Sequence, residues 1–442
     1  MAPLHLEAQT MQWNNGKFLA FIKQLMTHIH HIRHLRVTVT PENLEEMFTQ
    51  LVSSAPSLER LSIANDDIHQ QEALVLPDNL FDGIAPKLID LRLNNCGIRW
   101  ESPLLKGLQN LKLISFPTRA LTTLKPWLDA LNQMPQLERL SLHGGIPIHS
   151  VTRLEAGLTV VLFSLTELDI SAPARQCIAV FAHLVLPALT GLRVSVRTHH
   201  KNDTLSNYVR RLIPHVARNA HGPHDTEPLQ SLFVGGDEEQ SKVVAWTGPR
   251  QDTDVELRRL ARVTFSTTTQ YGLVEKDIPM HDVLLTALPI NSITSLTVNG
   301  RTPLSREVWR THAPRWDKLD RVHLSPNAVP AFREMLEDAP RGEPLLPSLE
   351  ELVLNHVWLG AKKAYYLYDM LIDLVELDIP LRTLDLRKCN TSDRAVQLLS
   401  EIVVDVWGGG DEREDDFDYV PPFLGSWDIG EDDEDDESLP SE

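Results

Sequence analysis

A short apolar motif, Leu-x-x-Leu-x-Leu, recurs along the whole chain and sets the spacing of its hydrophobic positions. It is complete, with a cysteine three residues after its last leucine, at Leu88–Cys96 and again at Leu381–Cys389. The shorter core of the motif begins at Ile32, Leu58, Leu108, Leu137, Leu165, Leu189, Leu229, Leu260, Ile293, Leu319 and Leu349. Together these matches predict thirteen units of a leucine-rich repeat.

The thirteen units are unevenly spaced, with gaps of 20 to 40 residues between successive first positions. The mean gap is about 29 residues, a length at which the return segment of each unit is usually a helix. The motif places apolar side chains on one face of a short strand, so a single unit cannot bury its own face and its neighbours must stack on it. The gap of 20 predicts a unit without a helix, and the gap of 40 after Leu189 predicts an insertion.

Between the strands the apolar spacing changes to that of amphipathic helices. Four segments have this spacing, namely Leu44–Leu51, Leu124–Leu131, Ala331–Leu336 and Ala395–Ile402. Helix-start signals precede two of them, at Pro41 and at Ser392. We therefore expect an α/β fold, a curved leucine-rich-repeat solenoid with strands on its concave side and helices on its convex side.

The negative charge of the chain is concentrated at its C-terminal end. The whole chain carries a formal charge of -19, and residues 408–442 contain 15 acidic residues against one arginine. Such a segment has too few apolar residues to fold alone and is predicted to be disordered. We expect a helical cap over residues 1–30, the solenoid over 31–407 and an acidic disordered tail over 408–442. The tail either solubilises the protein or binds a partner through its scattered aromatic residues.

Several classes of protein are disfavoured by the same composition. A nearly balanced body with an acidic tail does not suit nucleic acid. Cys96, Cys177 and Cys389 are far apart and form no CxxC pair, so we expect inert buried thiols in a reducing compartment. No apolar run is long enough to cross a bilayer. We expect an intracellular protein, in the cytoplasm, the nucleus or both, that binds neither membrane nor nucleic acid.

The chain carries few candidates for catalysis or metal binding. The histidine-rich run from His28 to His34 is the best metal candidate, but no carboxylate or cysteine lies close to it, and a solvated helix end is the favoured interpretation. The sequence contains no phosphate-binding glycine loop, no GxSxG elbow and no HExxH motif. We therefore expect no enzymatic activity, no cofactor and no metal.

The solvent-facing strand positions are the candidate binding surface. Their acidic residues are Asp90, Glu167, Asp169, Glu351 and Asp385, and their more numerous basic residues are Arg36, Arg60, Arg92, Lys112, Arg139, Arg193, Arg262, Arg321 and Arg387. We expect the basic residues from Arg36 to Arg139 to form one row with a spacing of about 5 Å. Such a row would bind an acidic segment of a protein partner, and the chain's own tail would compete for it. The alternative is ordinary solvated surface.

Strands of the form Pro-x-Leu-x-x-Leu-x-Leu begin at Pro56, Pro135 and Pro347. With the irregular units and the glycine- and acid-rich ending, they resemble fungal F-box proteins with leucine-rich-like repeats, over residues 20–407. The resemblance implies a substrate receptor of a cullin-type ubiquitin ligase, whose repeats hold the substrate. In that family a helical F-box with a Leu-Pro start precedes the repeats and docks the ligase adaptor. Here the first predicted strand begins at Ile32, so the adaptor is an expected partner only if a box lies upstream.

Two other classes combine such repeats with an acidic C-terminal tail. They are acidic nuclear proteins of the histone-chaperone type and regulators of the Ran GTPase-activating type. Both have more regular repeats than the spread of 20 to 40 residues seen here. They remain the alternative interpretation.

Overall fold

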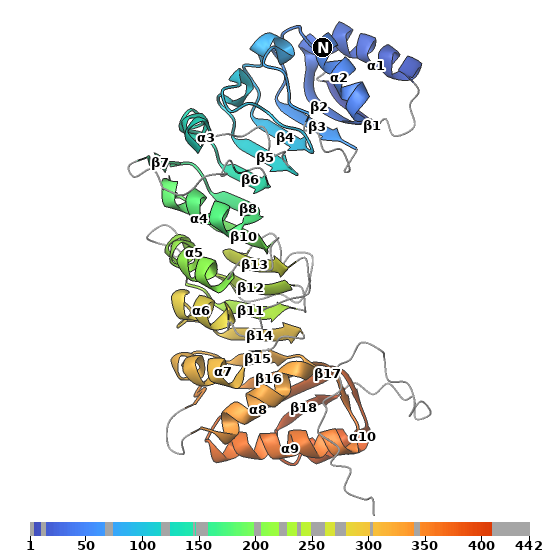
Figure 1. Ribbon diagram of the computed structural model, residues 1–442. Helices are drawn as coiled ribbons and strands as arrows, with labels where there is room; N and C mark the ends of the chain where they lie inside the picture. Colours follow the sequence, from blue (N-terminus) through green and yellow to red (C-terminus); the bar gives the residue numbers. More distant parts are fainter. Residues whose placement is uncertain are drawn as a thin grey trace, which may run out of the picture. The chain divides into compact units, whose positions relative to one another are not determined.

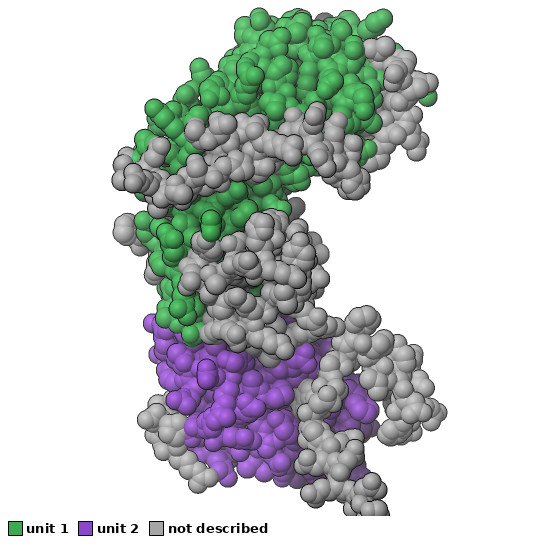
Figure 2. All heavy atoms as spheres, in the orientation of Figure 1, with its two compact units in different colours: residues 1–229, 239–289 green, residues 230–238, 290–442 purple. Residues whose placement is uncertain are grey.

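The structure is a computed structural model, and it divides into two compact units (Figure 2). Unit 1 comprises residues 1–229 and 239–289, and unit 2 comprises residues 230–238 and 290–442. The residues that the structure describes are 4–9, 15–66, 74–115, 124–144, 146, 158–198, 205–220, 228–236, 240–248, 261–269, 280–300, 304–339 and 345–408. Of the predicted acidic tail, residues 408–442, only Gly408 is described, and it ends a strand instead of beginning the tail. Residues 409–442 lie outside the described residues.

Unit 1 is built on a large sheet with the spatial order β1-β2-β3-β4-β5-β6-β8-β10-β13-β12. All neighbouring strands in this unit are parallel except β12, which is antiparallel to β13. The strands are β1 (Leu4–Gln9), β2 (Ile32–Val39), β3 (Arg60–Asn65), β4 (Asp90–Asn94), β5 (Asn110–Ile114), β6 (Arg139–His143), β8 (Glu167–Pro173), β10 (Gly191–Thr198), β12 (Gln240–Trp246) and β13 (Val263–Thr269).

The leucine motif defines the strands β2 to β6, β8 and β10 as predicted. Leu91 and Leu93 are both buried on β4, and Leu91 aligns with Leu61 on one side and Leu111 on the other. The same alignment continues through Leu140, Leu168 and Leu192. Because equivalent leucines stack on their equivalents in the next strand, each unit buries the apolar face of its neighbour.

Helices cover one side of this sheet, as Figure 1 shows for α4 and α5 beside β8 and β10. The described helices of unit 1 are α1 (Asn15–His28), α2 (Pro41–Gln50), α3 (Leu124–Asn132), α4 (Ala174–His183), α5 (Leu205–Ala220) and α6 (Met280–Ala287). The predictions for α2 and α3 are confirmed, with Pro41 in the first turn of α2. The shortest gap between motifs, 20 residues, runs from Leu88 to Leu108 and predicts a unit without a helix. In the described stretch 95–109 there is a 3-10 turn at Pro103–Leu105 and no α-helix, which agrees with that prediction. A small second sheet pairs β7 (Val160–Val161) with β9 (Leu184–Val185).

The simple succession of units predicted from the sequence is wrong after β10. The neighbour of β10 is β13 rather than the next strand in the sequence, and β12 pairs antiparallel beyond β13. The motif specifies which face of a strand is buried but not which strand lies beside it. β13 fits because Val263 and Phe265 are buried and align with Leu192 and Val194. The strands β1 and β12 lack the motif and were not predicted.

Unit 2 is a parallel sheet with the order β11-β14-β15-β16-β17-β18. Its strands are β11 (Ser231–Gly236), β14 (Ser295–Gly300), β15 (Arg321–Leu324), β16 (Glu351–Leu359), β17 (Thr383–Thr391) and β18 (Asp405–Gly408). At Gly300 the backbone φ is +112°, and an added Cβ would lie 1.9 Å from the carbonyl oxygen of Gly236. Only glycine permits this close approach between β14 and β11.

The helices of unit 2 are α7 (Arg306–His312), α8 (Val329–Glu337), α9 (Ala361–Glu376) and α10 (Asp393–Leu399). The predicted start of α10 is confirmed, because the side chain of Ser392 accepts a hydrogen bond from the backbone N–H of Ala395. Between α7 and α8 the ring of Trp309 packs edge-on against Trp316 and Phe332, at centroid distances of 5.8 and 5.1 Å. These buried aromatics fix the helices to each other. Among the described helices, none combines the length and the apolar character that crossing a membrane requires.

Candidate binding face

The polar side chains of the unit-1 sheet stand in two aligned rows. Row 1 consists of the residues that precede the second apolar position of each motif: His34, Arg60, Asp90, Asn110, Arg139, Glu167 and Gly191. Row 2 consists of the residues between the second and third apolar positions: Arg36, Ser62, Arg92, Lys112, Ser141, Asp169, Arg193 and Thr264. We call the surface that carries both rows the polar face.

The prediction of a single basic row is wrong. Arg60 and Arg139 stand in row 1, whereas Arg36, Arg92 and Lys112 stand in row 2. The two motif positions are two residues apart, which places the rows about 7 Å apart along the strands. Within row 2, only Arg92 and Lys112 are adjacent basic residues among the first five predicted. The cations therefore alternate with neutral and acidic residues.

Three of the predicted cations of the polar face, Arg36, Arg92 and Arg193, already have a carboxylate partner. Arg92 donates from Nε and Nη2 to Asp90, at 2.9 and 2.8 Å. These hydrogen bonds outweigh partial burial and raise the pKa of Arg92 above its usual value. Arg36 lies 3.5 Å from Glu7 on β1, and Arg193 lies 3.2 Å from Asp169. Their charges are largely neutralised where they stand.

Arg262 does not belong to the polar face at all. The sequence places it at an exposed strand position, but its side chain is only 4% exposed. Burial lowers the pKa of its guanidinium. The prediction that Arg262 is a solvent-facing contact is wrong, because burial at the start of β13 depends on neighbours that the motif does not specify.

In unit 2 the two predicted basic residues also form ion pairs. Arg321 on β15 donates to Glu351 on β16, with 2.6 Å between Nε and Oε2. Arg387 on β17 donates to Asp385 at 3.0 and 2.6 Å, and its guanidinium lies 4.8 Å from the ring centroid of Trp407. Trp407, nearly half exposed on β18, was not singled out from the sequence.

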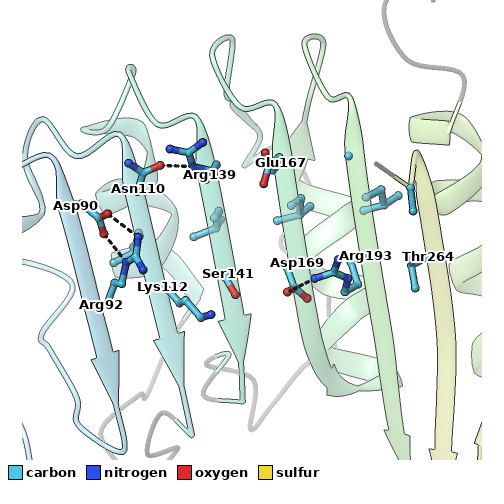
Figure 3. A pocket seen from close by; sticks show the side chains of 16 residues that line it. Asp90, Arg92, Asn110, Lys112, Arg139, Ser141, Glu167, Asp169, Arg193 and Thr264 are labelled. Carbon is cyan, nitrogen blue, oxygen red and sulfur yellow. Dashed lines mark hydrogen bonds and ion pairs between the residues drawn. The ribbon is translucent and has the colours of Figure 1, made fainter. Parts of the chain in front are cut away.

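A hollow of about 520 Å³ crosses the polar face from β4 to β13 (Figure 3). Its charged lining residues are Asp90, Arg92, Lys112, Arg139, Glu167, Asp169 and Arg193. Asn110, Ser141, Gly191 and Thr264 complete the rows inside it. The sequence did not predict a hollow, because its depth depends on the small side chains at Ser141 and Gly191 being brought beside longer ones.

Ser141 and Asp169, which line the hollow, and the nearby His143 are the three residue types of a catalytic triad. Ser141 Oγ lies 3.4 Å from His143 Nε2, and the same nitrogen lies 3.2 Å from Asp169 Oδ2. In a nucleophilic triad the serine and the carboxylate contact opposite nitrogens of the imidazole. Since both contact Nε2 here, the histidine has no separate nitrogen for orientation and for proton transfer. This cluster is an ion-pair network.

Asp169 is the centre of that network. Burial alone would raise the pKa of its carboxyl, but the hydrogen bond and charge of His143, together with Arg193, outweigh burial and lower the pKa below its usual value. Asp169 therefore holds Arg193 and His143 in place on the two neighbouring strands.

The other chemical candidates are structural. Cys96, Cys177 and Cys389 are buried free thiols, as predicted, and burial raises the pKa of the first two to about 12 and that of Cys389 to about 11. Within the described ranges, no group of three or more His, Cys, Asp or Glu side chains could hold a metal. His34 packs edge-on against His5 of β1, with ring centroids 4.0 Å apart. That pair was missed because β1 was not predicted.

No protein-family model matches this chain, and no curated protein matches it. Among solved structures, it is similar to the leucine-rich repeat-containing protein LegL7 from Legionella pneumophila, at 11% identity and a TM-score of 0.29. That similarity covers 81% of this chain and 85% of LegL7. A similarity this distant carries no argument about function.

Proposed function

We propose that this chain is a leucine-rich-repeat solenoid that binds another protein through the polar face of unit 1 and catalyses no reaction. The observation that carries the proposal is the hollow across aligned rows of charged side chains. The rows stand on strands whose other faces are packed in the core, so their spacing of about 4.8 Å per strand is fixed before any partner binds. A rigid, open and charged surface suits a protein segment better than an enclosed small molecule.

The mixed charge of the hollow supports a protein partner over a nucleic acid. Asp90, Glu167 and Asp169 alternate with the cations of the lining, so a phosphate backbone would meet carboxylates along its path. A protein segment carries charges of both signs and can match such a surface. We assign direct contacts to Lys112 and Arg139, which line the hollow, and to Arg60, which stands in row 1. Arg36, Arg92 and Arg193 have an orienting role through their carboxylate pairs.

We further propose that the bound protein is a substrate of an F-box-type ubiquitin ligase. Support comes from the strands of the form Pro-x-Leu-x-x-Leu-x-Leu and the irregular repeat spacing. The alternative is an acidic-tailed regulator that binds core histones or a small GTPase. Purified chain is tested separately against a ligase adaptor with its substrates, core histones and Ran-type GTPases. Saturable binding in one arm alone identifies the class.

The binding face itself is tested by filling the hollow. An ideal Cβ at Gly191 makes only ordinary contacts, the nearest at 3.5 Å to Glu167, and Gly191 lines the hollow, so Gly191→Trp is chosen to add bulk there. We expect this variant to bind an identified partner at least about tenfold more weakly, since a filled pocket excludes the partner's contacts. Lys106→Trp is the control, because Lys106 is exposed and does not line the hollow. Equal binding by wild type and Gly191→Trp would refute the polar face as the binding site.

A further inference from the structure

We propose that the hollow holds one carboxylate side chain of the partner between Lys112 and Arg139, and one basic side chain of the partner beside Glu167. This inference rests on the proposed protein-binding function and specifies the chemistry of the segment bound. The ligand class is an extended peptide segment with an acidic and a basic residue separated by about two strand spacings.

Lys112 and Arg139 are the two cations lining the hollow whose charge is available to a ligand. Neither lies within ion-pair distance of a carboxylate among the described residues. Arg139 donates from Nε to the neutral Oδ1 of Asn110 at 2.6 Å, which turns its guanidinium toward β5 (Figure 3). Lys112 stands on β5 itself, in the other row, and its ammonium extends toward β6. Diagonal neighbours on adjacent strands are about 7–8 Å apart, so the two oxygens of one carboxylate can reach both cations.

The other two cations of the hollow already form ion pairs within the protein. Arg92 is held by Asp90 on its own strand, and Arg193 is held by Asp169 on the next strand. A ligand carboxylate therefore gains less binding free energy beside Arg92 or Arg193 than it does between Lys112 and Arg139. Ser141 aligns with Lys112 and carries a small side chain, which leaves room for the ligand at this point.

Glu167 has the opposite role. It aligns with Arg139 in row 1, yet the arginine turns away from it toward Asn110, and no ion pair joins the two. On its other side Glu167 aligns with Gly191, which has no side chain. An exposed carboxylate beside an empty row position accommodates a lysine or arginine of the partner and repels a second carboxylate.

The spacing of the two subsites limits the partner sequence. The carboxylate subsite lies between β5 and β6, and the basic subsite lies between β8 and β10, which are two strand steps further along the sheet. Two steps amount to about 10 Å, the length of two to four residues of extended chain. An acidic residue followed or preceded at that distance by a basic residue matches the hollow.

Two length-matched peptides test this match, one repeating Glu-Gly-Gly-Lys and one repeating Glu-Gly-Gly-Gln. Binding to the full chain is measured by calorimetry at low salt and at about 0.15 M salt. We expect Lys112→Gln/Arg139→Gln to weaken both peptides about 5- to 20-fold at low salt, because two exposed ion pairs are lost. We expect Glu167→Gln to weaken the lysine-containing peptide about two- to fivefold and to leave the glutamine-containing peptide unchanged or tighter.

The matched control is Lys87→Gln/Lys106→Gln, which removes the same charge from exposed residues of unit 1 outside the hollow. An equal loss in both double variants, or no binding by wild type at low salt, overturns the carboxylate subsite. An identical response of both peptides to Glu167→Gln overturns the basic subsite. If an identified partner is lost in Gly191→Trp but binds Lys112→Gln/Arg139→Gln normally, the binding face stands and this inference fails.

Discussion

Asp90 and Arg92 lie two residues apart on β4, and the guanidinium of Arg92 binds both carboxylate oxygens of Asp90. The side chain of Asp90 is 7% exposed, whereas that of Arg92 is 58% exposed. The carboxylate of Asp90 is thus buried against the sheet, and the side chain of Arg92 lies over it on the solvent side. Asp385 and Arg387 repeat the arrangement on β17. This intrastrand pair keeps Arg92 from adding its full charge to that of Lys112.

Removing the charge of Asp90 should release Arg92. We expect Asp90→Asn to strengthen the binding of the Glu-Gly-Gly-Gln peptide about two- to fivefold at low salt, because Arg92 then offers its charge to the ligand. Stability should fall by about 1 kcal/mol as the charged hydrogen bonds are lost. Calorimetric titration and urea unfolding measure the two effects. Weaker peptide binding by a folded Asp90→Asn variant would contradict this account.

Leu91 is fully buried on β4 between Leu61 and Leu111. Replacing it with alanine should cost about 2–5 kcal/mol, because a cavity forms between stacked units. Since each unit supports its neighbours, amide protons of β3 and β5 should also exchange faster. Urea unfolding and hydrogen exchange test both points, with exposed Lys87→Ala as the control. Normal protection of β3 and β5 would mean that the units are not coupled.

Residues 409–442 are predicted from their composition to contribute nothing to the folded core. Gly408 aligns with Leu386 as the last residue of β18, so the truncation must follow Gly408 and spare that strand. We expect truncation there to change the melting temperature by less than about 2 °C. Truncation after Val404 removes β18, leaves β17 without its outer neighbour and should lower the melting temperature clearly. A large drop in the longer variant would show that the tail stabilises the fold.

The pKa of His34 lies below its usual value of 6.5, first because of burial and then because of the charges of His5, Arg60 and Arg33, which outweigh Glu59. The fold therefore favours neutral His34. Well above pH 6.5 His34 is neutral in both states and does not lower the free energy of unfolding. As the pH falls below 6.5 the unfolded state binds the proton more readily than the folded state, so the free energy of unfolding decreases. Comparing urea midpoints at about pH 7.5 and pH 5.5, we expect His34→Gln to reduce the loss of stability on acidification. An unchanged loss would place the acid sensitivity elsewhere.

The local pattern of the chain determined the elements that depend only on neighbouring residues. The motif leucines at Leu91 and Leu93 predicted a buried strand, and the signals at Pro41 and Ser392 predicted where α2 and α10 begin. These predictions succeed because the side-chain periodicity of strands and the capping of helices are fixed within a few residues. The candidate face was also predicted, since the motif assigns its intervening positions to the solvent side.

The pairing of distant strands was decided only by the tertiary structure. It put β13 beside β10, buried Arg262 and joined Asp169 to Arg193 across β8 and β10. Whether a cation is neutralised or available depends on the residue that the register sets beside it, as Asn110 is set beside Arg139. Such contacts depend on the packing of whole units. No spacing within a single motif encodes them, because the free energy that selects a strand's neighbour is shared among residues far apart in the sequence.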